Sequence, residues 1–126
     1  MSQKRLYGIR GATGVENTKE SIIENVGTVC RAIFSDNKIK AQDIVSIQFT
    51  MTADIDEYNA AAALRSSSCG IDVSECALFC AVEPQVKTSL PRIIRVLVTA
   101  YLPEKTQVKN IYMNRAATLR PDFICR

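Results

Sequence analysis

The 126-residue sequence contains no histidine and no tryptophan, and only 6% of its residues are aromatic. Without histidine, neither a Ser-His-Asp nor a Cys-His nucleophile can form, and most catalytic zinc sites lose a ligand. The usual phosphate-binding glycine loops are missing as well. An enzyme built from this chain must therefore work without the standard acid–base side chain of neutral pH.

Long hydrophobic runs are also absent, and no apolar stretch reaches signal-peptide or membrane-spanning length. The five cysteines form no C-x-x-C pair, so we expect free thiols in a reducing cytoplasm, no metal site and no cofactor. The net charge of +3 comes from scattered basic residues and suits a small anion at least as well as a polyanion. We expect neither nucleic acid nor a membrane as partner.

Apolar periodicity predicts alternating strands and helices within one domain over residues 1–126. Asn17 is expected to cap the first helix with Glu20 in a capping box, and Asp54 the second. Cys30 lies on the apolar stripe of the first helix. Strands are predicted at about 5–12, 44–52, 76–83, 92–102 and 108–113, and helices at about 18–35 and 56–68.

This order is typical of an α+β domain in which helices cover one face of a mixed sheet. In the strand at 44–52, Val45, Ile47 and Phe49 alternate with polar residues. The polar half marks a second sheet face, which must be wet or covered by another copy of the chain.

Three charged residues interrupt the apolar strands: Arg10, Glu83 and Arg95. One interpretation is a structural ion pair between Glu83 and either arginine. Two arginines and one glutamate nevertheless leave surplus positive charge, which a bound carboxylate would neutralise. Tyr112 offers a further hydroxyl donor to such a ligand.

The motifs YGIRGAT-VE, T-D, C--E, SLPR-IRVL, IY and LRPD follow one another across residues 7–122. This pattern resembles chorismate mutase, in its small homotrimeric α/β-barrel class. The resemblance implies a pseudo-α/β-barrel homotrimer with a cleft at each subunit interface. It also implies the Claisen rearrangement of chorismate to prephenate, which is intramolecular and needs no cofactor, metal or proton transfer.

The same resemblance implies a role for each site residue. Arg95 meets the ether oxygen and a carboxylate, Arg10 binds a carboxylate, and Glu83 accepts from the ring hydroxyl. Tyr112 donates to a carboxylate. The other implied substrate-binding residues are Phe79, Cys80, Ala81, Val82, Leu119 and, from a neighbouring subunit, Arg65.

The chain departs from the family pattern at residues 58–62. Family members commonly have an aromatic–proline pair there, whereas this sequence reads YNAAA. Counting back from Arg65 puts Asn59 at the aromatic position, so either Tyr58 or Asn59 lines the cleft.

Two alternatives remain at this point. One is a trimeric carboxylate-binding or deaminase-like protein of similar fold, and the other is a structural trimer with buried ion pairs. The spacing of Glu83 and Arg95, together with LRPD, favours the mutase.

Overall fold

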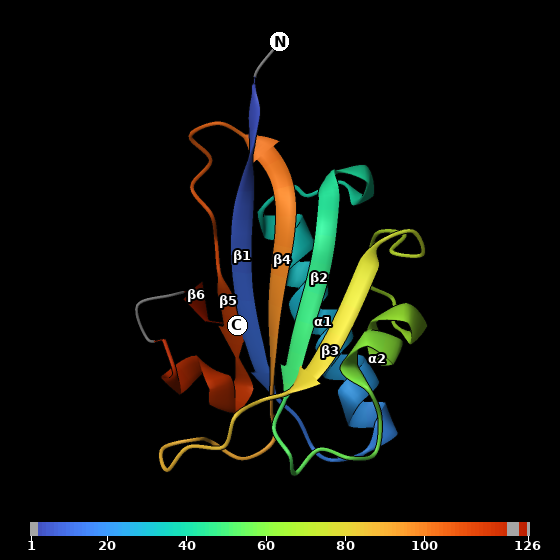
Figure 1. The fold of residues 1–126 in the computed structure, drawn as a ribbon, viewed down its shortest axis with the longest axis vertical. Coiled ribbons are helices and arrows are strands. Elements are labelled where there is room, and N and C mark those ends of the chain that lie inside the picture. The colour runs from blue at the N-terminus through green and yellow to red at the C-terminus, as the bar shows by residue number, and fades with distance from the viewer. Residues whose placement is uncertain (1–2, 121–123, 126) are drawn as a thin grey trace.

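A mixed β-sheet with helices on one side forms the frame of the protein (Figure 1). The computed structural model describes residues 3–120 and 124–125. Its helices are α1 (Lys19–Asp36) and α2 (Ala60–Ser66), and short 3₁₀ helices span Ala41–Asp43 and Asn114–Thr118. The strands are β1 (Lys4–Gly14), β2 (Ile44–Met51), β3 (Ala77–Val82), β4 (Ile93–Pro103), β5 (Ile111–Met113) and β6 (Ile124–Cys125). The α+β class with a mixed sheet is confirmed, although β5 is shorter than expected.

The sheet brings distant segments of the chain together around β4. Within the described residues the strand order is β3-β2-β4-β1-β5-β6. Strand β4 is antiparallel to both of its neighbours, whereas β3 is parallel to β2 and β5 is parallel to β1. This register places Arg95 of β4 opposite Ala12 of β1 and opposite Thr50 of β2.

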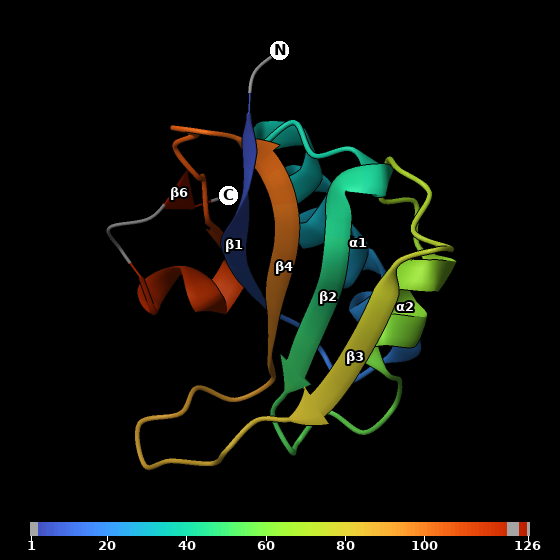
Figure 2. The same ribbon diagram turned by 45° about the horizontal axis from the view of Figure 1, so that its top comes forward.

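Alternate side chains of β4 point to the two faces of the sheet, which are a core face and an open face. Val96 and Val98 are buried, while Arg95 and Leu97 alternate with them on the other side. Both helices lie behind the core face in the two ribbon views (Figures 1 and 2). The buried stripe of α1 includes Cys30, as the helical periodicity predicts.

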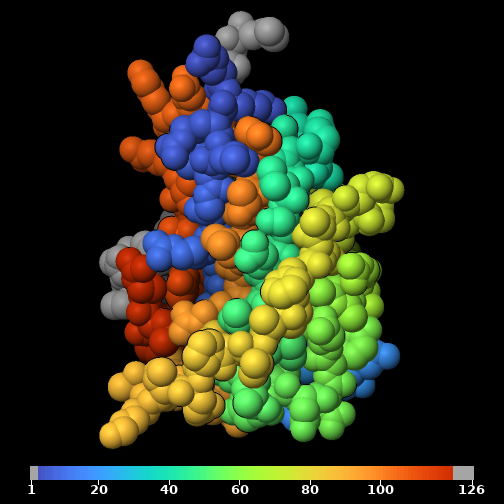
Figure 3. Space-filling view, in the orientation of Figure 1, coloured from blue at the N-terminus to red at the C-terminus, as the bar shows by residue number. Residues whose placement is uncertain are grey.

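The face opposite the helices is uncovered in the single chain (Figure 3). Leu6 and Tyr101, which pair across β1 and β4, are 43% and 44% exposed, and Phe79 on β3 is 63% exposed. Burying such side chains is worth about 25 cal/mol for each Å² of apolar surface. Apolar surface of this kind is typical of an interface with another chain.

Helix α1 starts differently from the sequence-based expectation. Its N-cap is Thr18, whose hydroxyl accepts the backbone N–H of Ser21 at 3.1 Å. This moves Glu20 from the third helical position to the second. The expected cap, Asn17, instead accepts the backbone N–H groups of residues 56–57 with its side-chain oxygen. The expectation was wrong because both residues can cap, and a tertiary contact recruits one of them.

Helix α2 begins at Ala60 rather than near residue 56. Its N-cap is Asn59, whose Oδ1 accepts the backbone N–H groups of residues 61–62 at 2.8 and 3.2 Å. Asp54, the expected cap, accepts the backbone N–H of Arg92 with both carboxylate oxygens at 3.1 and 3.0 Å. Asp54 therefore ties the end of β2 to the start of β4 and does not cap the helix.

Strand β2 breaks its alternation near its start. Val45 is 47% exposed, although alternation predicts it on the core face with Ile47 and Phe49. The register with β4 shifts between Ile44 and Ser46. A bulge of this type moves one residue out of the alternating pattern.

Gly11 lets α1 approach the sheet closely. A Cβ at this position would lie 2.7 Å from Ile33 Cδ1 and 3.0 Å from the backbone oxygen of Ile111. We expect Gly11→Ala to lower the free energy of unfolding by about 1–3 kcal/mol, since the backbone oxygen cannot move aside as a side chain can. Urea denaturation measures the change.

Gly8→Ala is the matched control for this prediction. A Cβ at Gly8 would meet Leu97 Cδ1 at 3.5 Å, an ordinary contact. Its effect should stay below about 1 kcal/mol. Equal effects of the two variants would contradict the steric explanation.

Candidate active site

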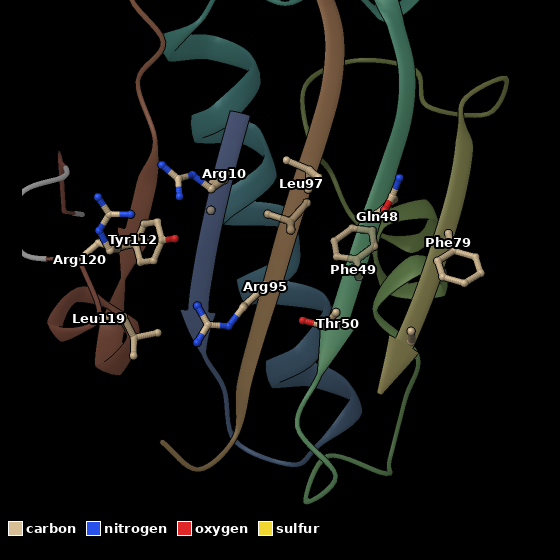
Figure 4. Close-up of a pocket in the computed structure, with 13 residues that line it drawn as sticks. Arg10, Gln48, Phe49, Thr50, Phe79, Arg95, Leu97, Tyr112, Leu119 and Arg120 are labelled. Atoms are coloured by element: carbon tan, nitrogen blue, oxygen red, sulfur yellow. The ribbon is translucent and has the colours of Figure 1, made fainter. Parts of the chain in front are cut away.

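A cavity of about 640 Å³ opens on the uncovered face of the sheet (Figure 4). Strands β1 to β5 and the segment after Thr118 contribute to its walls. The residues predicted from the sequence that line it are Arg10, Phe79, Ala81, Arg95, Tyr112 and Leu119.

An ion pair joins Arg95 to Glu83 at the edge of this cavity. Glu83 follows β3 directly, and its backbone N–H donates to Met51 O of β2 at 2.8 Å. Glu83 Oε1 accepts from Arg95 Nε at 2.8 Å and from the Thr50 hydroxyl at 2.7 Å. The Glu83 side chain is only 12% exposed and that of Arg95 41%, so water screens this pair less than a surface pair. Of the two arginines, Glu83 thus pairs with Arg95.

Positive charge dominates the cavity. Arg10, Arg95 and Arg120 line it, and within the described residues no acidic side chain does. Figure 4 shows Arg10, Arg120 and Tyr112 on one side, with Phe79 across from them on β3. A guanidinium group can bind a carboxylate with two parallel hydrogen bonds. The cavity is therefore suited to a small anion that carries carboxylates.

Contacts outside the cavity position the side of it that carries Arg10 and Tyr112. The backbone N–H of Arg10 donates to Asn110 Oδ1 at 2.8 Å and fixes β1 against the segment leading into β5. Tyr112 is buried in a small cluster with Ala12, and Leu119 packs against this cluster. This apolar packing holds the ring of Tyr112, which also lines the cavity.

Sequence reasoning missed several lining residues. Gln48, Thr50 and Leu97 line the cavity, and strand alternation already placed each of them on the open face. Arg120 also lines it, and its signal was the LRPD motif, from which only Leu119 was assigned. The last two residues of that motif, 121–122, lie outside the described residues.

Other predicted site residues do not line this cavity. Asn59, Cys80 and Val82 line a second groove of about 330 Å³ near the ends of β2 and β3. Arg65 lines a third groove of about 360 Å³ beside the loop after α2. Cys80 alternates with Ala81 along β3 and does not line the cavity, whereas Ala81 lines both the cavity and the second groove, so the two adjoin at this strand. One chain therefore does not bring all the predicted residues together.

The two candidates at the family's aromatic position face different ways. Asn59 lines the second groove while capping α2. The ring of Tyr58 lies under Lys19 of α1, with Nζ 5.1 Å from the ring centre, and its hydroxyl is 3.3 Å from Ser66 Oγ. Tyr58 is thus turned toward α1, and Asn59 is the residue on a groove.

Cys30, Cys69, Cys76 and Cys80 are free thiols. Burial raises the pKa of Cys30 far above its ordinary value, with a smaller contribution from Cys69. Burial also raises the pKa of Cys76, followed by the charges of Asp72 and Cys69. Among the described residues, no group of three His, Cys, Asp or Glu side chains is placed to hold a metal ion.

Within the described part of the chain, every helix is too short or too polar to cross a bilayer.

Fold and site together define an α+β protein with a cationic cavity on an open sheet face. The family model for chorismate mutase type I matches residues 6–123. The chorismate mutase AroH of Bacillus subtilis is 32% identical over 94% of this chain and 92% of its own length. That of Thermus thermophilus is 34% identical over 92% of this chain and 94% of its own length.

A solved structure agrees with these sequence relatives. A chorismate mutase from Clostridium thermocellum superposes with a TM-score of 0.80 at 33% identity, over 89% of this chain and 98% of its own. The chain therefore belongs to the chorismate mutase type I family and is an isomerase. These findings favour the mutase over the carboxylate-binding and purely structural alternatives.

Proposed function

We propose that the open-face cavity binds chorismate and converts it to prephenate, with the whole chain acting as one domain. The observation that carries the assignment is Arg95, held by Glu83 in a cavity that Arg10 and Arg120 also line. Chorismate is a dicarboxylate, and guanidinium groups such as those that line the cavity bind carboxylates with paired hydrogen bonds.

Arg95 supplies the main electrostatic effect in this proposal. Its Nε is engaged by Glu83, and its terminal nitrogens extend toward the side of the cavity formed by Tyr112 and Leu119 (Figure 4). As the ether C–O bond breaks, negative charge grows on the oxygen. A cation already oriented toward that oxygen stabilises the transition state more than the ground state.

The remaining residues hold the substrate in its reactive shape. Arg10 binds one carboxylate, and the Tyr112 hydroxyl donates to a carboxylate. Glu83 accepts from the ring hydroxyl. Holding both parts of a flexible molecule in contact replaces an entropic cost of the reaction with binding free energy.

The site is completed by another chain. Leu6, Leu97, Tyr101 and Phe79 are exposed on the open face, and Asn59, Cys80 and Arg65 line separate grooves. We propose a homotrimer with the sheets facing inward as a pseudo-α/β-barrel. The groove-lining residues of one subunit then close the cavity of the next.

We also place the protein in the cytoplasm, because the free thiols of Cys30, Cys69, Cys76 and Cys80 favour a reducing compartment.

The direct test of the proposed function is the fall in chorismate absorbance on adding the protein, with Arg95→Ala as the decisive variant. We expect kcat to drop by about 10²–10³, the range for losing one donor to a developing charge. Arg95→Lys keeps the charge but loses the planar fork, and it should recover only part of the loss. A folded Arg95→Ala protein that keeps kcat within about tenfold of wild type would contradict this mechanism.

Subunit mixing tests the shared site. Arg95→Ala removes a residue of the cavity and Arg65→Ala a residue of a separate groove, so each homotrimer should be impaired. In trimers co-assembled from equal amounts of the two, about one site in four joins an intact cavity to an intact groove. Activity should then rise toward a quarter of wild type.

Light scattering must first show that both variants remain trimers. If the mixture is no more active than the separate variants, the site lies within one chain or the partners are assigned wrongly. A fully active wild-type monomer would overturn the trimer altogether.

The turnover number should change little between about pH 6 and 8. The sequence has no histidine, and the pKa values of Asp72, Cys30 and Cys76 are all moved away from this range. Hydrogen bonds from Ser74 lower the pKa of Asp72, so it stays ionised. Burial raises the pKa of Cys30 and Cys76, so they stay protonated. A bell-shaped kcat profile centred near neutrality would reveal a proton transfer and exclude a purely intramolecular rearrangement.

A further inference from the structure

Thr50 occupies a special place in the sheet. It lies on β2 between β4, which carries Arg95, and β3, which Glu83 follows directly; Thr50 is opposite Ala81 of β3 and opposite Arg95 of β4. Its side chain is on the open face and lines the cavity. In Figure 4 its hydroxyl points toward Arg95.

The Thr50 hydroxyl must be the donor in its bond to Glu83. Oγ1 lies 2.7 Å from Glu83 Oε1, and an ionised carboxylate can only accept. The same Oε1 accepts from Arg95 Nε at 2.8 Å. Two donors from two different strands therefore converge on one oxygen of a carboxylate that is only 12% exposed.

We propose that Thr50 is a positioning residue that orients Glu83, and through it Arg95, for the reaction. The terminal torsion of a glutamate is broad and weakly restrained by itself. The two hydrogen bonds to Oε1 restrain that torsion and leave Oε2 for the substrate hydroxyl. With Nε held by the fixed Oε1, the terminal nitrogens of Arg95 stay directed into the cavity.

Substitutions of similar shape at Thr50 separate the effect of the hydroxyl group from the effect of the side chain's shape. Valine at position 50 keeps the β-branched form that suits a strand but cannot donate. Serine keeps the donor and loses only a methyl group. Thr99 provides the control, because it lies on the open face of β4 outside the cavity lining.

The experiment compares steady-state kinetics of wild type, Thr50→Val, Thr50→Ser and Thr99→Val, each checked for folding and assembly. We expect Thr50→Val to lower kcat/KM about ten- to a hundredfold, chiefly through kcat, since a hydrogen bond to a charged group is lost. Thr50→Ser and Thr99→Val should stay within about threefold of wild type, short of the loss of such a bond.

A double-mutant cycle shows whether Thr50 acts through Glu83. In a Glu83→Ala background, Thr50→Val should change kcat/KM by less than about twofold, because the group that it orients is gone. If its full effect persists there, or if Thr50→Val alone matches wild type, the positioning role is wrong.

This inference rests on the proposed function, and the outcomes keep the two apart. A large loss in Arg95→Ala with none in Thr50→Val would overturn only the role of Thr50. Absence of mutase activity in wild type, or full activity in Arg95→Ala, would overturn the proposed function and the role of Thr50 with it.

Discussion

The ion pair between Arg95 and Glu83 is the interaction on which the cavity depends. It joins β4 to the end of β3 across β2, and Thr50 of the intervening strand donates to the same carboxylate oxygen. An arginine alone on this face would carry an uncompensated charge beside apolar residues. With Glu83 only 12% exposed, the pair holds the cation in one orientation at a cavity that Arg10 also lines.

The sheet can carry this ion pair because its two faces differ: one packs against the helices and the other is open. The core face packs against α1, where Gly11 allows close approach to Ile33. The open face keeps polar and charged side chains at regular intervals, since alternate residues of each strand point to it. The register between neighbouring strands then sets the distances between these side chains. Arg95 of β4, for example, is opposite Thr50 of β2 on one side and opposite Ala12 of β1 on the other.

Alternation along the strands was enough to predict the faces of Arg10 and Arg95, because the side-chain period of a strand is strict. It could not predict which of several polar residues caps a helix, since Asn17 and Thr18 are both competent and only the contact of Asn17 with residues 56–57 decides. Val45 was misplaced by a bulge that leaves no signal in composition. Arg120 was overlooked because its reach into the cavity depends on how the chain turns after β5.

Strand β3 is both an edge available to a neighbouring subunit and the strand that leads into Glu83. In the described sheet it is an edge strand that pairs only with β2, yet Glu83 follows it directly. Edge strands are less well held than central ones and readily accept a neighbouring chain. Phe79 and Val82 on this strand are 63% and 68% exposed, and a neighbouring subunit packed along this edge would lie next to Glu83. In the proposed trimer the same contact that completes the cavity therefore also lies beside the carboxylate that orients Arg95.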